Sequence, residues 1–217
     1  MKIRIIFAIL IAALFSGHHA YAIEDGNELT EKQKEIIRGR VTQKVEEFFS
    51  SLSRMVDESL TRNTRTEHQN SLLNLFMGKG GPYSMTDEDN NVQEYPGVLM
   101  WTSSINRPTK TDMFLRSYVK RLYNPETGKS KMRYSEIKIE SADAVRVDNI
   151  EREGDHYVCV AYFYQDFYGI RDGRVQYRDR TGKRVKCYIY TIDVPDVGKV
   201  FDAKLADITV VSTQPIY

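Results

Sequence analysis

The 217-residue chain has no excess of charge of either sign, and it contains little histidine and little cysteine. Its 31 Lys and Arg residues balance 30 Asp and Glu residues, so the charge gives no reason to expect a nucleic acid or an anionic membrane surface as a partner. Only His68 and His156 follow the N-terminal segment, too few for a zinc cluster. We therefore expect neither a metal nor a cofactor.

The longest apolar run lies at the N-terminus. Lys2 and Arg4 precede the apolar residues 5–15, and Ala20-Tyr21-Ala22 places alanine at both cleavage positions of a signal peptide. A retained membrane anchor fits less well, because about 20 apolar residues are needed to cross a bilayer. We predict a signal peptide over residues 1–22 and an exported, periplasmic or secreted protein. Residues 23–217 are predicted to form a single soluble domain without a membrane span.

Three stretches have apolar residues at the spacing of an α-helix. The first, residues 28–60, repeats them at steps of three and four, which predicts one long amphipathic helix with Gly39 inside it. Thr30 followed by Gln33 fits a capping box at its start. A shorter helix is predicted over residues 66–77 and a third over residues 108–123.

The remaining chain favours strands. Residues 98–104, which include Trp101, fit a short strand, and residues 203–212 fit a final strand. Residues 134–140 and 144–152 alternate apolar and polar side chains, as two strands or as one long bulged strand. The acidic stretch 84–94 is predicted to be a surface loop. Helices followed by a series of strands indicate the α+β class rather than βαβ repetition.

Residues 156–194 predict a long antiparallel hairpin around Asp172-Gly173, a strong signal for a two-residue turn. We expect residues 179–182 to be irregular, with Thr181-Gly182-Lys183 as a turn between strands. Tyrosines at i, i+2 spacing share a face on each strand, either to fill the core or to line a ligand pocket. The candidate ligand-binding residues are Trp101, Tyr118, Tyr162, Tyr164, Tyr188 and Tyr190.

Both cysteines lie on this hairpin. A turn at Asp172-Gly173 pairs residue 171 with residue 174, and one extra residue in a bulge within 179–182 brings Cys159 opposite Cys187. Export permits a disulfide between directly opposed cysteines. A disulfide and a pair of reduced, buried thiols both remain open.

The order of these elements resembles the nuclear-transport-factor-two-like superfamily, which includes scytalone dehydratase and ketosteroid isomerase. The resemblance is carried by the long helix at 28–60, by LLNLFMGKGG at 72–81, by VLMWTSS at 98–104, by the helix at 110–123 and by the strands from 134 to 212. It implies N-terminal helices packed on a strongly curved, cone-like antiparallel sheet. The superfamily's enzymes use Asp, Tyr or His inside the cone, and no stretch here matches such a motif residue by residue.

Without a catalytic motif, the sequence favours a binding protein over an enzyme. Our leading hypothesis is an exported, non-catalytic protein that holds a small apolar or amphipathic ligand, or a protein partner, on the aromatic sheet. The first alternative is a lyase or isomerase that uses a Tyr or a carboxylate as acid or base. The second is a structural or interaction module of the cell envelope, including a homodimer, since this fold is often dimeric.

Overall fold

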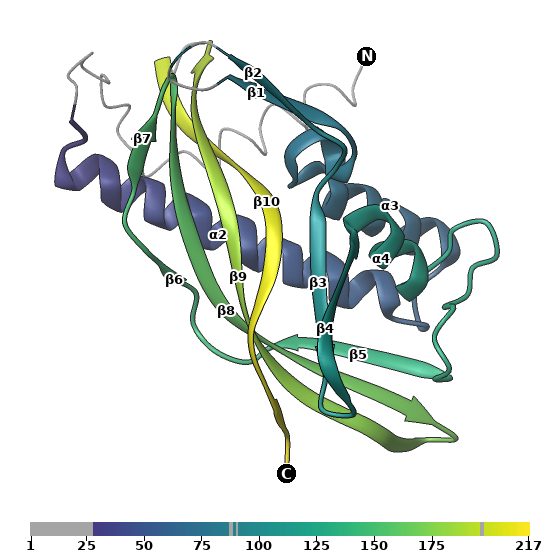
Figure 1. The fold of residues 1–217 in the computed structure, drawn as a ribbon. Coiled ribbons are helices and arrows are strands. Elements are labelled where there is room, and N and C mark those ends of the chain that lie inside the picture. Colours follow the sequence, from purple (N-terminus) through teal and green to yellow (C-terminus); the bar gives the residue numbers. More distant parts are fainter. Residues whose placement is uncertain (1–27, 87–88, 90, 196–197) are drawn as a thin grey trace, which may run out of the picture.

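The computed structural model describes residues 28–86, 89, 91–195 and 198–217 (Figure 1). The predicted signal peptide at 1–22 lies outside the described residues. Helices occupy the first part of the described chain and a large sheet most of the rest, so the predicted α+β class is confirmed. None of the helices in the described part of the chain is long and apolar enough to cross a membrane.

The first helix of the described chain, α2 (Glu31–Val56), forms within the stretch that the apolar spacing predicts. The capping box is present: the Gln33 N–H donates to Thr30 Oγ1 at 3.2 Å, and the Thr30 N–H donates to Gln33 Oε1 at 2.8 Å. These bonds satisfy two backbone groups that a helix start leaves free. One stripe of α2 is buried against the sheet. It consists of Ile37, Val41, Val45, Phe48, Phe49, Leu52, Met55 and Val56.

The second helix, α3 (Arg62–Asn74), begins earlier than predicted because Thr61 caps it. The Thr64 N–H donates to Thr61 Oγ1 at 3.3 Å, which satisfies one donor of the first turn. A short 3-10 helix, η1 (Met77–Gly80), follows α3 and contains two left-handed residues, Gly78 and Lys79.

Two predictions about residues 84–123 are wrong. Residues 107–114 form a strand, β4 (Arg107–Phe114), and only α4 (Leu115–Leu122) is helical in the predicted third helix. The apolar spacing that indicated a helix begins at Phe114, whereas the preceding residues are mostly polar and pair with β3 (Leu99–Ser104). The predicted acidic loop contains a hairpin of β1 (Tyr83–Thr86) and β2 (Val92–Tyr95). The rings of Tyr83 and Tyr95 stack across it with centroids 4.7 Å apart.

Eight strands form one open sheet in the order β4-β3-β10-β9-β8-β5, and β6 and β7 also pair with β8. The alternating stretch before residue 154 therefore contains three separate strands along one edge of β8: β5 (Glu136–Ser141), β6 (Arg146–Val147) and β7 (Glu151–Glu153). The long strands are β8 (His156–Arg171), β9 (Arg174–Val194) and β10 (Gly198–Pro215). All pairings are antiparallel except β10 with β3. The long strands curve, and α2 runs across one face of them (Figure 1).

The core lies between α2 and the inner face of the sheet, which we define as the face toward α2. The Phe49 ring meets the Phe163 ring of β8 edge to face, with centroids 5.2 Å apart, and Phe48 packs against Phe76 at 5.6 Å. Such aromatic contacts add roughly 1 kcal/mol each beyond the apolar area that they bury.

The β8–β9 hairpin turns at Asp172 and Gly173, whose φ angles of 54° and 70° are both left-handed, as a two-residue type I′ turn requires. The bulge lies closer to the turn than predicted: Gly169 pairs with Tyr177 and Ile170 with Val175, which leaves one extra residue on β9. The register beyond it is nevertheless the predicted one, and Cys159 lies directly opposite Cys187.

Both cysteines are free thiols in the structure, and both are buried. A hydrogen bond with Cys159 and burial raise the pKa of the Cys187 thiol well above its ordinary value. We expect the native protein to resist alkylation at both positions, because both thiols are buried and the raised pKa of Cys187 leaves little thiolate there.

Denaturing the protein without reductant and then titrating its thiols tests the state of this pair. Two reactive thiols agree with the structure, whereas none would reveal the disulfide that the register also permits. Rapid labelling before denaturation would contradict the burial.

A matched pair of glycine substitutions tests the fold. Gly39 in α2 is exposed, and no atom lies within 4 Å of an added Cβ, so Gly39→Ala is expected to stabilise the protein by about 0.5–1 kcal/mol. Gly182→Ala places a Cβ 2.5 Å from Ser212 Oγ and is expected to cost about 1–3 kcal/mol. Urea unfolding of both variants measures the difference. Equal effects would contradict the packing described for Gly182.

Candidate functional site

The inner face of the β8–β9 hairpin changes from apolar to polar toward its turn. Near α2 this face carries Cys159, Ala161 and Phe163, all buried in the core. Closer to the turn, the same face carries two cross-strand pairs, Gln165 with Thr181 and Phe167 with Asp179, and Lys183 lies opposite Phe163. We call these three cross-strand pairs the polar rows. The polar members of these rows are buried, namely Gln165, Asp179, Thr181 and Lys183. Buried polar groups are costly unless they have partners, so their clustering marks this end of the hairpin as a candidate site.

A cavity of about 610 Å³ lies over these polar rows. Its other walls come from the β3–β4 hairpin, from α4 and from residues 131–134. The apolar and aromatic part of the wall consists of Met113, Tyr118, Leu122, Met132, Tyr134, Phe167 and Tyr177. The rest of the lining is polar or charged, so the wall combines an apolar surface with polar groups that can orient a small molecule.

Lys183 is the most unusual group of the cavity. Its Nζ donates to Gln165 Oε1 at 2.9 Å and lies 5.9 Å from the centroid of the Tyr118 ring. No carboxylate of the described residues lies within 4.0 Å of it. Burial lowers the pKa of Lys183 to about 7, and the charge of Asp179 opposes this shift only in part. The amine is therefore partly neutral near neutral pH.

Asp179 is the only carboxylic acid that lines the cavity within the described part of the chain. The Tyr177 hydroxyl donates to Asp179 Oδ2 and lies 2.9 Å from Ser104 Oγ. Burial raises the pKa of Asp179, although the bond from Tyr177 and the nearby Lys183 work in the opposite direction. Burial and the bond to Asp179 also raise the pKa of Tyr177, to about 12. The Tyr177–Asp179 pair can therefore hold a proton inside the cavity.

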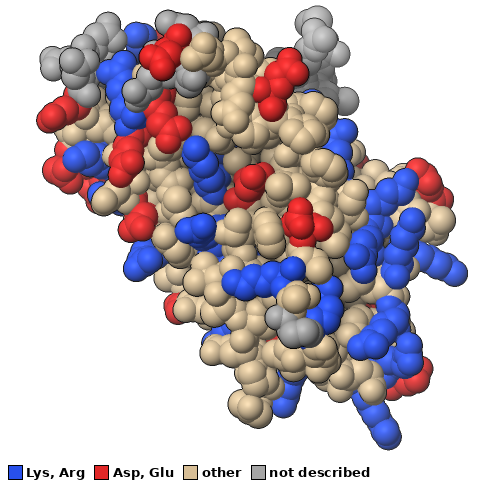
Figure 2. Space-filling model, in the orientation of Figure 1, with Lys and Arg blue, Asp and Glu red and all other residues tan. Residues whose placement is uncertain are grey.

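Four exposed cations form what we call the basic rim of the cavity. They are Arg107, Arg121, Lys131 and Arg133. None of the four forms an ion pair with a described carboxylate. In Figure 2, Lys and Arg side chains gather over α4 and the nearby end of the β8–β9 hairpin, where few Asp and Glu side chains are visible. The rim therefore presents positive charge that no described carboxylate approaches within 4.0 Å.

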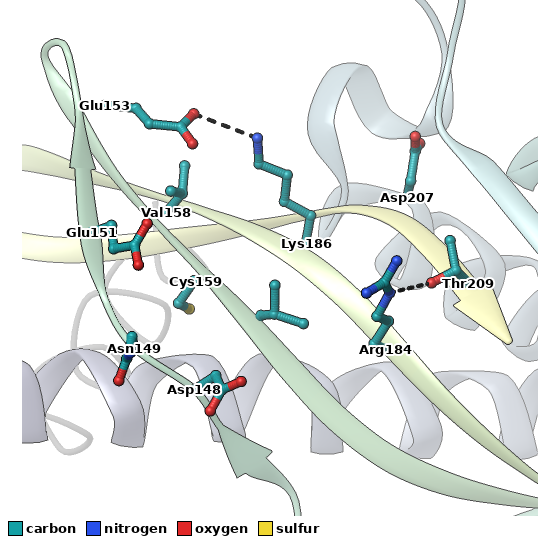
Figure 3. A pocket seen from close by; sticks show the side chains of 11 residues that line it. Asp148, Asn149, Glu151, Glu153, Val158, Cys159, Arg184, Lys186, Asp207 and Thr209 are labelled. Atoms are coloured by element: carbon teal, nitrogen blue, oxygen red, sulfur yellow. Dashed lines mark hydrogen bonds and ion pairs between the residues drawn. The ribbon is translucent and has the colours of Figure 1, made fainter. Parts of the chain in front are cut away.

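A second cavity, of about 450 Å³, lies on the outer face of the sheet (Figure 3). Its cations already have partners: Lys186 Nζ lies 3.4 Å from Glu153 Oε2, and Arg184 Nε donates to Thr209 Oγ1 at 2.9 Å. Asp207 accepts the Leu99 N–H at 2.8 Å. Because each of these charged groups already has a partner within the protein, the inner cavity is the stronger candidate.

Of the aromatic residues that the sequence suggested, only Tyr118 lines the inner cavity. Tyr162 and Tyr164 alternate with the inner residues of β8 and thus face the outer side. Tyr164 is 40% exposed, and the Arg146 guanidinium carbon lies 4.6 Å from the centroid of the Tyr162 ring. Trp101 is half-buried on β3 and does not line the cavity.

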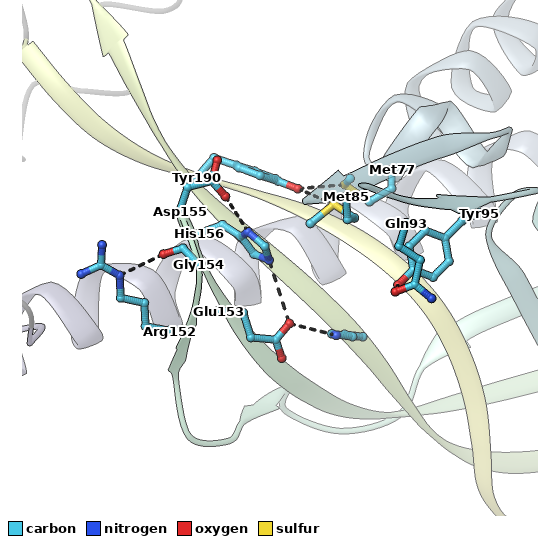
Figure 4. A network of polar contacts seen from close by, with 11 residues as sticks. Met77, Met85, Gln93, Tyr95, Arg152, Glu153, Gly154, Asp155, His156 and Tyr190 are labelled. Carbon is cyan, nitrogen blue, oxygen red and sulfur yellow. Dashed lines mark hydrogen bonds and ion pairs between the residues drawn. The ribbon is translucent and has the colours of Figure 1, made fainter. Parts of the chain in front are cut away.

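Tyr188 and Tyr190 instead pack around His156, with ring centroids 5.5 Å and 5.7 Å from the imidazole. Figure 4 shows Tyr190 beside His156. His156 Nδ1 lies 2.9 Å from Asp155 Oδ1, while the buried Nε2 has no hydrogen-bond partner among the described residues. The Tyr190 hydroxyl donates to Met85 Sδ at 3.2 Å, which ties the cluster to the β1–β2 hairpin. Neither His156 nor His68 lines the inner cavity.

Sequence reasoning missed Lys183 and Asp179 because Thr181-Gly182-Lys183 was predicted to be a turn. That prediction is wrong: β9 continues through these residues without interruption. The glycine lies where Ser212 and the Tyr164 ring approach the strand, so it reflects close packing rather than a turn. One signal was available: residues 179, 181 and 183 are polar and share a face with the apolar Val185 and Cys187.

Replacing Lys183 tests its burial. The folded-state pKa of about 7 lies below the ordinary 10.5, so the unfolded chain binds more protons between these values. Burying Lys183 therefore lowers the free energy of unfolding by its full amount below about pH 7, and this destabilisation disappears as the pH rises toward 10.5. We expect Lys183→Met to be more stable than the parent near pH 7 by roughly 3 kcal/mol, with the difference shrinking toward pH 10.

Urea unfolding of both proteins across this interval measures the difference. Lys186→Met on the outer face is the matched control, for which no such convergence is expected. Parallel stability curves for Lys183→Met and the parent would contradict the assigned burial.

Comparisons of this chain with protein-family models, with curated proteins and with solved structures found no match.

Proposed function

We propose that this protein binds a small amphipathic anion in the inner cavity. The observation that carries the proposal is the charge of the lining. The four cations of the basic rim border the cavity without ion pairs to described carboxylates, and the one lining carboxyl among the described residues, Asp179, has a raised pKa. A site with uncompensated positive charge favours an anionic ligand and disfavours a cationic one.

The apolar wall supports an amphipathic ligand rather than an inorganic anion. Met113, Leu122, Met132 and Phe167 offer a surface on which an aliphatic or aromatic body gains free energy by leaving water. The volume of about 610 Å³ lies within the usual range for small-molecule sites. The anionic group would lie at the basic rim, and the apolar body would extend toward the buried rows of β8 and β9.

Polar groups deep in the cavity would fix the orientation of the ligand. Lys183 and Gln165 already bond to each other, and Tyr177 bonds to Asp179, so these side chains are held in place before a ligand arrives. Preorganised groups lose little conformational entropy on binding. This arrangement favours a ligand with a polar atom at its buried end as well as an anionic group at the rim.

The Tyr177–Asp179 pair favours a second candidate, a lyase or isomerase that acts on the same ligand. A carboxyl with a raised pKa beside a tyrosine is suited to move a proton to or from a bound molecule. Binding is the more economical proposal, because it needs only the charge and shape of the cavity.

We also propose that the chain is an exported relative of the nuclear-transport-factor-two-like proteins. A long N-terminal helix packed on a curved sheet, with a cavity at one end of that sheet, supports a cone-like arrangement of this kind. Export, a protein partner and a homodimer remain predictions from the sequence.

A pair of fluorescent probes tests the proposed binding. 1-Anilinonaphthalene-8-sulfonate carries an apolar body and a sulfonate, and N-phenyl-1-naphthylamine has the same body without the charge. We expect the sulfonate probe to bind with 1:1 stoichiometry and at least about tenfold more tightly than the neutral probe, which corresponds to about 1.4 kcal/mol. The affinity should fall as salt is added, because the rim charges are exposed.

The double variant Arg121→Gln/Arg133→Gln is expected to weaken the sulfonate probe about tenfold or more and to leave the neutral probe unchanged. Arg38→Gln, on the exposed side of α2, is the matched control and should change neither affinity. Equal binding of both probes, or no effect of the double variant, would overturn the assignment of an anionic ligand to this cavity.

A further inference from the structure

Lys183 combines three features that few lysines share. The residue is only 3% exposed, it lines a cavity large enough for a small molecule, and the only hydrogen bond of its side chain among the described residues goes to the neutral amide oxygen of Gln165. A buried lysine is normally paired with a carboxylate. A lysine that serves only to bind an anion gains nothing from being this deep, because the four cations of the basic rim already supply positive charge.

These features match those of a nucleophilic amine. An ammonium group has no lone pair, whereas a neutral amine attacks electrophilic carbon. Burial lowers the pKa of Lys183 to about 7, so a substantial fraction of the amine is neutral at neutral pH. The bond to Gln165 orients Nζ without fixing a positive charge on it, because the acceptor is an amide rather than a carboxylate.

We propose that Lys183 forms an imine with an aldehyde or ketone that also carries an anionic group, so that the ligand of this cavity is an amphipathic oxo acid. This inference rests on the proposed function and names the chemical class of the ligand. The anionic group lies at the basic rim and the carbonyl carbon lies next to Lys183 Nζ.

The reaction needs no oxidant or reductant. The lone pair of the neutral Nζ forms a bond to the carbonyl carbon, and the π electrons of the carbonyl move to its oxygen. A proton shift from nitrogen to oxygen gives a carbinolamine. Protonation of its hydroxyl, loss of water and loss of the remaining N–H proton then leave a C=N bond. The net change is the release of one water molecule, and hydrolysis reverses it.

Asp179 is placed to supply the proton for the departing hydroxyl. It lines the same cavity on the same strand face as Lys183, and it is held by the Tyr177 hydroxyl. Burial raises the pKa of Asp179, which favours the protonated acid that such a step requires. Lys183 and Asp179 therefore provide a nucleophile and an acid at separate places in one cavity.

Reductive trapping with 4-formylbenzoate and sodium cyanoborohydride near neutral pH tests the inference. The reduced adduct is a stable secondary amine, and peptide mapping by mass spectrometry locates it. We expect Lys183 to be labelled at least about tenfold faster than any other lysine, because exposed lysines with a pKa near 10.4 are almost fully protonated at this pH. The preference should decline toward pH 10, where other lysines lose their protons as well.

Lys183→Met is expected to abolish the preferred labelling, and Lys183→Arg provides a second variant that keeps the charge but has no nucleophilic amine. Lys186→Met, on the outer face of the sheet, is the matched control and should label as the parent does. Because the peptide map of the parent protein already ranks the lysines, the test does not depend on any variant folding. Labelling spread evenly over the lysines would overturn the inference.

Competition with the sulfonate probe separates this inference from the proposed function. 4-Carbamoylbenzoate has the anionic group and the ring of 4-formylbenzoate but cannot form an imine. If both compounds displace the probe and only the aldehyde labels Lys183, the inference stands. Displacement by both without preferred labelling of Lys183 would overturn the imine and leave the anion site. Failure of both to displace the probe, without preferred labelling, would overturn the inference together with the proposed class of ligand.

Discussion

The backbone pairing of β8 with β9 decides where the important side chains point. A two-residue turn, one bulge and the period of two along each strand place Phe163, Gln165 and Phe167 on the face that also carries Asp179 and Lys183. On the outer face, the bidentate pair of Asp166 and Arg180, with N–O distances of 2.8 Å and 2.9 Å, holds the same register. A shift of β9 by one residue would move Lys183 to the outer face, so the cavity depends on this register.

The inner face of the sheet has two parts with opposite effects on stability: the part that α2 covers and the part that carries the candidate site. Where α2 covers the inner face, Phe48 and Phe49 meet Phe163, and apolar burial of each such side chain contributes roughly 1.5–3 kcal/mol to stability. Beyond the part of the sheet that α2 covers, the same strands carry Lys183 and Asp179. Burying these two charged side chains lowers the stability of the folded protein. The stable core thus compensates for the burial of polar groups in the cavity. That burial lowers the pKa of Lys183 and raises the pKa of Asp179, which changes the chemistry that the two groups can perform.

Much of the fold could be predicted because its local signals are strong. The spacing of Ile37, Val41 and Val45 predicted the long helix, and Asp172-Gly173 predicted the hairpin turn. Predictions failed where sequence signals compete with distant contacts. Residues 107–114 pair with β3, although the apolar spacing that follows them suggested a helix. The acidic stretch forms a hairpin in which Tyr83 and Tyr95 stack.

The candidate site shows the same difference between local sequence signals and contacts between distant parts of the chain. By itself the sequence determined the α+β class and the hairpin turn, because turns and periodicity act between neighbours in the chain. The opposition of Cys159 and Cys187 also needs a bulge, which the sequence placed within 179–182 and the structure places nearer the turn. Only the tertiary structure decided that Lys183 is buried beside Gln165 and that Arg121 and Arg133 border the same cavity. These residues come from separate strands, from α4 and from the segment after it. Burial and charge at a site depend on what the fold brings next to it, and no local pattern in the chain encodes that.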